Sequence, residues 1–191
     1  MMKSYQIYTA ETASSPVDKL LLAVEDMLGF VPNVFGAIAA SEPALRAFIQ
    51  LNVQLAEAGF SDTERAIIQI AVSTENECTY CVAGHTAFAE QQDVDANIVN
   101  AARNKHSINN KKLNVLQKFT RALVQSKGPI DAQHLKEFLS VGYTQSQALE
   151  VIMGVCVKTF SNLTNNLIGL PLDEAFAKHA WSPTQLKAVN V

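Results

Sequence analysis

Residues 61–85 of this 191-residue chain read SDTERAIIQIAVSTENECTYCVAGH. Ser61 and Glu64 have the spacing of a capping box, in which each side chain bonds to the other residue's backbone, so a helix is expected to begin here. An apolar run continues that helix, and Asn76 is a residue type that commonly caps the next one. The stretch therefore predicts two consecutive helices, with Cys78 in the first turn of the second.

The same signals recur along the rest of the chain, whereas the alternation typical of strands is nearly absent. Capping residues and apolar spacing predict helices at roughly residues 16–28, 33–40, 43–58, 77–90, 93–102, 110–127, 131–139 and 145–165, with others beginning near 61 and 171. We expect a single all-α domain of about eight or nine helices over residues 1–191, with an N-terminal extension (1–15) and a C-terminal tail (177–191).

A faint internal repeat links two parts of the chain. Residues 59–64 (GFSDTE) are echoed by residues 142–147 (GYTQSQ), and at this offset Cys78 aligns with Ser161 and Cys81 with Thr164. A duplicated helix-turn-helix unit explains this pattern, and only its first copy would then carry thiols. An ordinary helix-start sequence used twice explains it equally well.

Composition limits the classes of function. The net charge of −3, without clustered Lys and Arg, argues against nucleic-acid binding. No apolar stretch reaches membrane-spanning length, and the first 15 residues lack the apolar run of a signal peptide. Because 48% of residues are hydrophobic and only 17% charged, we expect partner subunits to cover part of the surface. The chain is expected to be a cytoplasmic homo-oligomer without membrane contact.

Cys78 and Cys81 form a CxxC pair, and His85 follows Cys81 at i+4 on the same helix face. Such a pair can close a disulfide, and in a reducing compartment it is typically redox-active or metal-binding. The helix dipole favours a thiolate at Cys78, whereas His85 favours one at Cys81. Spacing alone leaves open which sulfur is the nucleophile.

Two less reactive interpretations of the pair are also open. The pair with His85 could be part of a zinc site, although a closed zinc site normally needs four protein ligands. The cysteines could also be small buried apolar residues. Cys156, which lies in an apolar run, is expected in the core. We expect neither a metal nor another cofactor.

Residues 61–65 and the motif CTYCVAGH at 78–85 resemble the carboxymuconolactone decarboxylase superfamily, and its alkylhydroperoxidase D-like, peroxidase-related branch in particular. The turn GFVPN at 29–33 and the segment from Asn162 to Glu174 are similar to further motifs of that branch. The resemblance covers roughly residues 20–176. It implies an all-α, internally duplicated fold that assembles into dimers, trimers or hexamers.

The resemblance also implies roles for individual residues. Cys81 would attack a hydroperoxide, Cys78 would resolve the resulting sulfenic acid as a disulfide, and His85 would relay protons. Tyr80 stands where some members have a relay histidine. A dithiol, a thioredoxin-like protein or a lipoyl group would reduce the disulfide.

One departure from the family pattern concerns the relay glutamate. The family's glutamate falls 12 residues before the first cysteine, where this chain has Ala66. Glu64 matches a second acidic position of the motif and is a candidate catalytic residue, although its capping-box position explains it as well. Glu75 and Glu77 are further candidates that the spacing does not distinguish.

The sequence therefore supports three hypotheses. The first is a thiol-dependent peroxidase or disulfide reductase that uses Cys78, Cys81 and His85. The second is an interaction protein that responds to the redox state without turnover. The third, ranked last, is an enzyme of the carboxymuconolactone decarboxylase type, whose members typically lack the CxxC pair.

Overall fold

A computed structural model describes residues 5–126 and 128–183. Within these residues the chain forms nine α-helices and one 3₁₀ helix and no strand, which confirms the all-α prediction. The helices are α1 (Val17–Leu28), α2 (Asn33–Ile38), α3 (Glu42–Glu57), α4 (Asp62–Glu75), α5 (Thr79–Gln91), α6 (Ala96–Arg103), α7 (Lys111–Gln125), α8 (Ala132–Ser140), α9 (Gln145–Ile168) and the 3₁₀ helix η1 (Glu174–His179). The predicted end of α7 at Lys127 lies outside the described residues.

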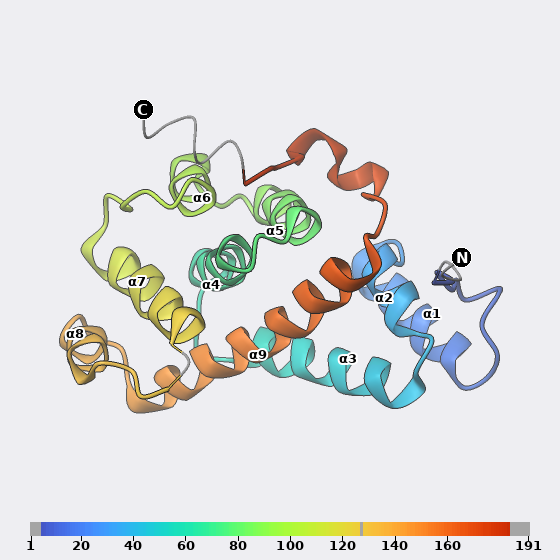
Figure 1. Cartoon of the computed structure of the whole chain (residues 1–191), viewed down its shortest axis with the longest axis horizontal. Helices are drawn as coiled ribbons and strands as arrows, with labels where there is room; N and C mark the ends of the chain where they lie inside the picture. Colours follow the sequence, from blue (N-terminus) through green and yellow to red (C-terminus); the bar gives the residue numbers. More distant parts are fainter. Residues whose placement is uncertain (1–4, 127, 184–191) are drawn as a thin grey trace.

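Helix α4 lies in the middle of the domain, with α5, α6, α7 and α9 around it (Figure 1). Its residues from Ala66 to Thr74 are almost all buried, on every side of the helix. A helix that is apolar all round is stable only when other elements cover all of it. The composition of α4 thus accounts for its central position.

The two predicted capping boxes both form. Ser61 and Glu64 cap α4, and Thr144 and Gln147 cap α9 in the same way. The two halves then differ, because α4 ends at Glu75 and a new helix begins, whereas α9 continues without a break to Ile168. In both halves a helix and a short turn precede the capped helix, α3 before α4 and α8 before α9, and the internal duplication stays a prediction.

The outer face of α9 overturns one prediction. Cys156 is exposed and does not lie in the core. The same face exposes large apolar side chains, including Leu149 (69% exposed), Leu163 (62%) and Leu167 (73%). Because α9 is apolar nearly all round, its sequence did not show which side faces the domain.

The segments at the two ends of the described chain pack on neighbouring helices. The Tyr8 N–H donates to the Gly36 carbonyl at 3.0 Å, and a Cβ at Gly36 would lie 2.5 Å from the Tyr8 carbonyl oxygen. Gly36 therefore permits the close approach of residues 5–15 to α2. At the other end, η1 packs over α5, where Gly84 faces the ring of Phe176.

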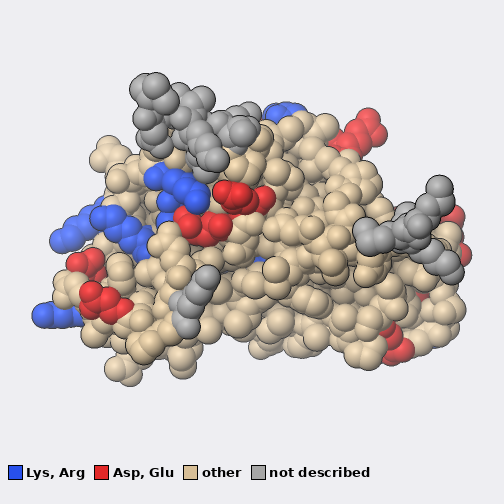
Figure 2. Space-filling view, in the orientation of Figure 1, with Lys and Arg blue, Asp and Glu red and all other residues tan. Residues whose placement is uncertain are grey.

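Charged side chains are unevenly distributed over the face shown in Figure 2. They lie mostly toward the end formed by α7 and α8, and much of the remaining face is uncharged (Figure 2). None of the helices in the described part of the chain is long and apolar enough to cross a membrane.

Candidate functional site

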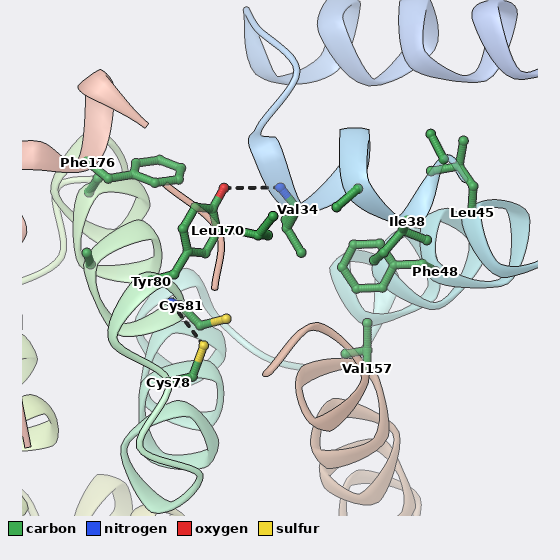
Figure 3. Close-up of a cluster of buried hydrophobic side chains, with 14 of the residues drawn as sticks. Val34, Ile38, Leu45, Phe48, Cys78, Tyr80, Cys81, Val157, Leu170 and Phe176 are labelled. Carbon is green, nitrogen blue, oxygen red and sulfur yellow. Dashed lines mark hydrogen bonds between the residues drawn. The ribbon is translucent and has the colours of Figure 1, made fainter. Parts of the chain in front are cut away.

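The CxxC pair lies at the junction of α4 and α5. The Cys78 N–H donates to the Ser73 carbonyl at 2.9 Å, which folds the chain back at the end of α4. Cys78 itself is the N-cap of α5, and its sulfur accepts the Cys81 N–H at 3.3 Å (Figure 3). The prediction that Asn76 caps this helix is wrong: Asn76 ends α4, and the intervening Glu77 has a positive φ of 50°.

Helix α9 holds this junction in place from the other side. The Asn76 side-chain amide donates to Asn162 Oδ1 at 2.9 Å, and Asn162 Nδ2 donates to Ser73 Oγ at 3.3 Å. Asn166 Nδ2 donates to the Asn76 carbonyl at 3.0 Å. Since Asn162 is fully buried, these bonds satisfy polar groups that have no access to water.

Both thiols are buried, but their environments differ. Burial raises the pKa of Cys81, whereas a hydrogen bond from Cys78 and the positive charge of Lys158 lower it. Hydrogen bonds from Asn162 and Ser161 add to the lowering, and the resulting pKa is about 7. The pKa of Cys78 is raised well above its usual range by its hydrogen bond to Cys81 and by burial. Cys81 is thus the more acidic thiol, against the expectation from the helix dipole.

Two residues of α9 that sequence reasoning missed complete the surroundings of Cys81. The Ser161 hydroxyl lies 3.9 Å from the Cys81 sulfur, and Lys158, only 4% exposed, lies one turn earlier on the same helix. With Asn162 and Asn165 they form a buried polar stripe at helical spacing on an otherwise apolar helix. That break in an apolar run is the signal in the sequence that could have identified them.

A cavity of about 400 Å³ opens beside Cys81 between α5, α9 and the first three helices. Its wall is largely apolar and includes the aromatic rings of Phe35, Phe48, Phe88 and Phe176. Cys81, His85, Tyr80, Lys158 and Ser161 also line it, so the cavity brings together three residues of α5 and two of the α9 stripe. In Figure 3 the Cys81 side chain points toward the space between α5 and the helices that carry Val34 and Phe48.

His85 lines this cavity, but its side chain makes no hydrogen bond with any residue that the structure describes. Burial lowers the pKa of His85 well below its ordinary value, and the charge of Lys158 lowers it further. The imidazole is therefore neutral at physiological pH.

Tyr80 occupies a structural position at the edge of the cavity. Its hydroxyl donates to Asp173. The same hydroxyl accepts the Val34 N–H at 3.3 Å (Figure 3). Asp173 also accepts the Asn33 N–H at 3.2 Å, so one carboxylate joins α2, α5 and the segment before η1. Burial and the bond to Asp173 raise the pKa of Tyr80, which keeps its phenol protonated.

The acidic candidates lie away from the cavity. Glu64 caps α4 and accepts the Tyr143 hydroxyl at 2.8 Å, and Lys112 pairs with it at 3.3 Å. Glu75 pairs with Lys105 at 3.2 Å, and neither Glu75 nor Glu77 is among the residues around the cavity. Ala66, in contrast, does line it. The position at which the resemblance implies a relay glutamate thus faces the cavity with a methyl group.

Metal binding is another chemistry that a CxxC pair with a histidine can support. In residues 5–126 and 128–183, no group of three or more His, Cys, Asp and Glu side chains is arranged to hold a metal ion.

Known proteins share the fold of this chain, and a family model matches part of its sequence. Residues 42–107, which include the CxxC pair and His85, match the model of the carboxymuconolactone decarboxylase family. A peroxidase-related protein from Ralstonia eutropha JMP134, with an alkylhydroperoxidase AhpD core, is 23% identical with a TM-score of 0.80, over 92% of this chain and 95% of that protein. One from Silicibacter sp. TM1040 is 20% identical with a TM-score of 0.76, over 91% and 95% of the two chains.

The fold is also similar to that of the debrominase Bmp8, at 19% identity and a TM-score of 0.79, over 94% of this chain and 96% of that protein. A cysteine-to-alanine variant of Bmp8 has been solved in complex with 2,3,4-tribromopyrrole, and it gives a TM-score of 0.78 at 19% identity, over 99% and 98% of the chains. No curated protein sequence matches the chain. The chain thus has an alkylhydroperoxidase D-like fold, and its residues 42–107 match the carboxymuconolactone decarboxylase family.

Proposed function

We propose that this protein is a thiol-dependent oxidoreductase that reduces organic hydroperoxides through a Cys78–Cys81 disulfide. The observation that carries the proposal is the position of Cys81, a thiol with a pKa of about 7 in the wall of an apolar cavity. A substantial fraction of this thiol is ionised at neutral pH, and the thiolate is the reactive nucleophile.

The proposed cycle has three steps. The Cys81 thiolate attacks the outer peroxide oxygen, so that an S–O bond forms, the O–O bond breaks and the alcohol leaves with a proton. The Cys78 thiol then attacks the sulfenic acid, which forms the disulfide and releases water. An external dithiol, a thioredoxin-like protein or a lipoyl group then reduces the disulfide by thiol–disulfide exchange and restores both thiols.

The cavity supports a substrate with an apolar body. Its aromatic and aliphatic wall favours an alkyl or aryl hydroperoxide over hydrogen peroxide, because apolar surface leaves water when such a molecule binds. His85 lines the same cavity, and we propose that it orients the substrate or relays a proton as a neutral group.

The test begins with a Cys156→Ser background, because Cys156 is exposed and would react with added oxidant. One equivalent of cumene hydroperoxide should reduce the mass of the reduced protein by two hydrogens. Cys78→Ser and Cys81→Ser should each abolish that loss. Equal hydroperoxide consumption by the wild type and the Cys78→Ser/Cys81→Ser double variant would rule out the proposal. A protein that forms the disulfide and changes its assembly or its partners, but does not turn over hydroperoxide, would favour the interaction hypothesis.

A second candidate is reductive dehalogenation of an aromatic compound. The cavity walled by four phenylalanine rings, without a carboxylate at Ala66, favours it, and Bmp8 with a similar fold is a debrominase. The Cys81 thiolate would take the bromine as the ring gains a proton, and Cys78 would then form the disulfide and release bromide and a proton. Bromide release from tribromopyrrole in the presence of a dithiol would distinguish this activity from peroxide reduction.

A further inference from the structure

Lys158 is a buried cation with no hydrogen-bonded or ion-paired partner among the described residues. It is only 4% exposed, and its ammonium group makes no hydrogen bond or ion pair with any residue in the described part of the chain. An unpaired buried charge is strongly unfavourable, so such groups usually lose the charge or acquire a counter-ion. The position of Lys158 therefore needs a physical explanation.

The charged and titratable groups around Lys158 offer one counter-ion. Those that line the cavity or interact electrostatically with Lys158 are Glu57 on α3, Arg65 on α4, Cys78 at the N-cap of α5, and Tyr80, Cys81 and His85 on α5. Glu57 is exposed and hydrogen-bonded to Gln54. Arg65 is paired with Asp62, His85 is neutral, and Tyr80 and Cys78 hold their protons. Only the Cys81 thiolate remains as the negative partner.

This partnership depends on the redox state of the thiols. Burial lowers the pKa of Lys158, and the negative charge on Cys81 raises it in turn. When the disulfide forms, the thiolate disappears, and no other buried anion among the described residues that line the cavity balances the ammonium charge. A buried lysine in that situation gives up a proton.

We propose that Lys158 is the proton donor of the reaction, so that the buried thiolate and ammonium charges are discharged together when Cys81 is oxidised. This inference rests on the function proposed above. In the first step, Cys81 thiolate, Lys158 ammonium and ROOH give Cys81 sulfenic acid, Lys158 amine and ROH. In the second, the Cys78 thiol and the sulfenic acid give the disulfide and water. The buried site is neutral overall before and after each step.

The donor takes the place of an acid that is missing beside the thiols. Ala66 leaves no carboxyl group on the wall beside the thiols, and His85 carries no extra proton to give. Lys158 reaches the same cavity from α9, about 80 residues away in sequence from the CxxC pair.

The decisive measurement follows the Lys158 side chain itself. Protein labelled with ¹⁵N at lysine Nζ and ¹³C at Cε would be titrated by NMR as the dithiol and as the disulfide, with Lys158→Met used to assign the signal. The acid constant of Lys158 should rise at least about tenfold on disulfide formation. The exposed Lys118 should not respond. An unchanged Lys158 titration would overturn the proposal.

The disulfide for this experiment can be made with diamide, which oxidises dithiols without a peroxide. The test therefore does not depend on peroxidase activity. If diamide produces the shift but hydroperoxide yields no disulfide, the proposed function fails and the coupling between Lys158 and the thiols stands. If hydroperoxide yields the disulfide but Lys158 stays charged, only the role of Lys158 fails.

A pair of variants separates proton donation from simple charge stabilisation. Lys158→Arg keeps a positive charge but cannot release a proton, because the guanidinium pKa is above about 12. It should leave the pH midpoint of Cys81 alkylation near that of the wild type but slow oxidation by cumene hydroperoxide about 100-fold or more, the usual contribution of general acid catalysis. Lys118→Met is the control. Oxidation of Lys158→Arg at the wild-type rate would overturn the assignment.

Discussion

The Tyr80 hydroxyl donates to the Asp173 carboxylate and thereby joins α5 to a segment 93 residues further along the chain. The same hydroxyl accepts the Val34 N–H, and Asp173 accepts the Asn33 N–H at the start of α2. The turn near residue 33 and the segment near residue 173 both resemble family motifs, and in the folded protein they meet at one tyrosine. This contact gives Tyr80 a structural role at the edge of the cavity.

The first prediction concerns that hydroxyl. Tyr80→Phe leaves the buried Val34 N–H and Asp173 with fewer partners, so the free energy of unfolding should fall by about 1–3 kcal/mol in denaturant titrations. The pH midpoint for Cys81 alkylation should stay near 7, because Tyr80 does not hydrogen-bond either sulfur in the structure. Tyr5→Phe, at an exposed tyrosine, is the control and should have little effect on stability. A loss of thiol reactivity without loss of stability would instead assign Tyr80 to the chemistry.

The second prediction is a pH dependence. The thiolate form of Cys81 is the reactive one, so alkylation by iodoacetamide should increase as the pH rises through about 7. Cys78, whose pKa is raised, should react far more slowly over the same range. Peptide mass spectrometry in a Cys156→Ser background would measure both rates. Faster alkylation of Cys78 than of Cys81 would contradict this assignment of the nucleophile.

The third prediction concerns Glu64. Glu64→Gln keeps a capping-box residue and a partner for Tyr143 but loses the ion pair with Lys112, so stability should fall by less than about 1 kcal/mol. The rate of disulfide formation should not change, since Glu64 does not line the cavity. Glu64→Ala should cost about 1–2 kcal/mol through the lost cap. A large fall in the oxidation rate of Glu64→Gln would restore the catalytic role that the motif suggests.

The fourth prediction tests the contact between α4 and α9. A Cβ at Gly154 would lie 2.7 Å from Cγ2 of Ile68, both deep in the core. Gly154→Ala should therefore lower the free energy of unfolding by about 1–3 kcal/mol, as overpacking generally does. At Gly59 the nearest atom to a new Cβ is 3.5 Å away, so Gly59→Ala is the matched control. If the two variants were equally stable, α4 and α9 would have accommodated the added methyl group without a loss of stability.

The fifth prediction concerns assembly. The homo-oligomer expected from composition is still a prediction, and the exposed apolar face of α9 is the place to test it. Leu163→Lys combined with Leu167→Lys should lower the molecular mass measured by light scattering, because a charge at a subunit contact is unfavourable. Lys replacing Leu22, an exposed leucine on α1, serves as the control. Wild-type protein that is monomeric at high concentration would contradict the expectation.

Local signals in the sequence accounted for most of the fold. Capping boxes at Ser61 and Thr144, and apolar residues at helical spacing, depend on neighbours within a turn or two, so they predicted where helices begin. Where two local signals competed, prediction was less accurate. Asn76 and Cys78 can both cap a helix, and the Cys78 N–H bond to Ser73, together with the contacts from α9, decides in favour of Cys78.

The sequence by itself determined the all-α class, the CxxC pair with His85, and the absence of the family's glutamate at position 66. Each of these is written in residues close together in the chain. Only the tertiary structure decided that Lys158 and Ser161 surround Cys81, that Tyr80 bonds to Asp173, and that Cys156 faces outward. These relationships join residues from separate helices or depend on which face of α9 packs inward. The reason is physical: helix periodicity fixes the spacing of side chains around an axis, whereas the rotation of that axis against its neighbours is set by packing of the whole domain.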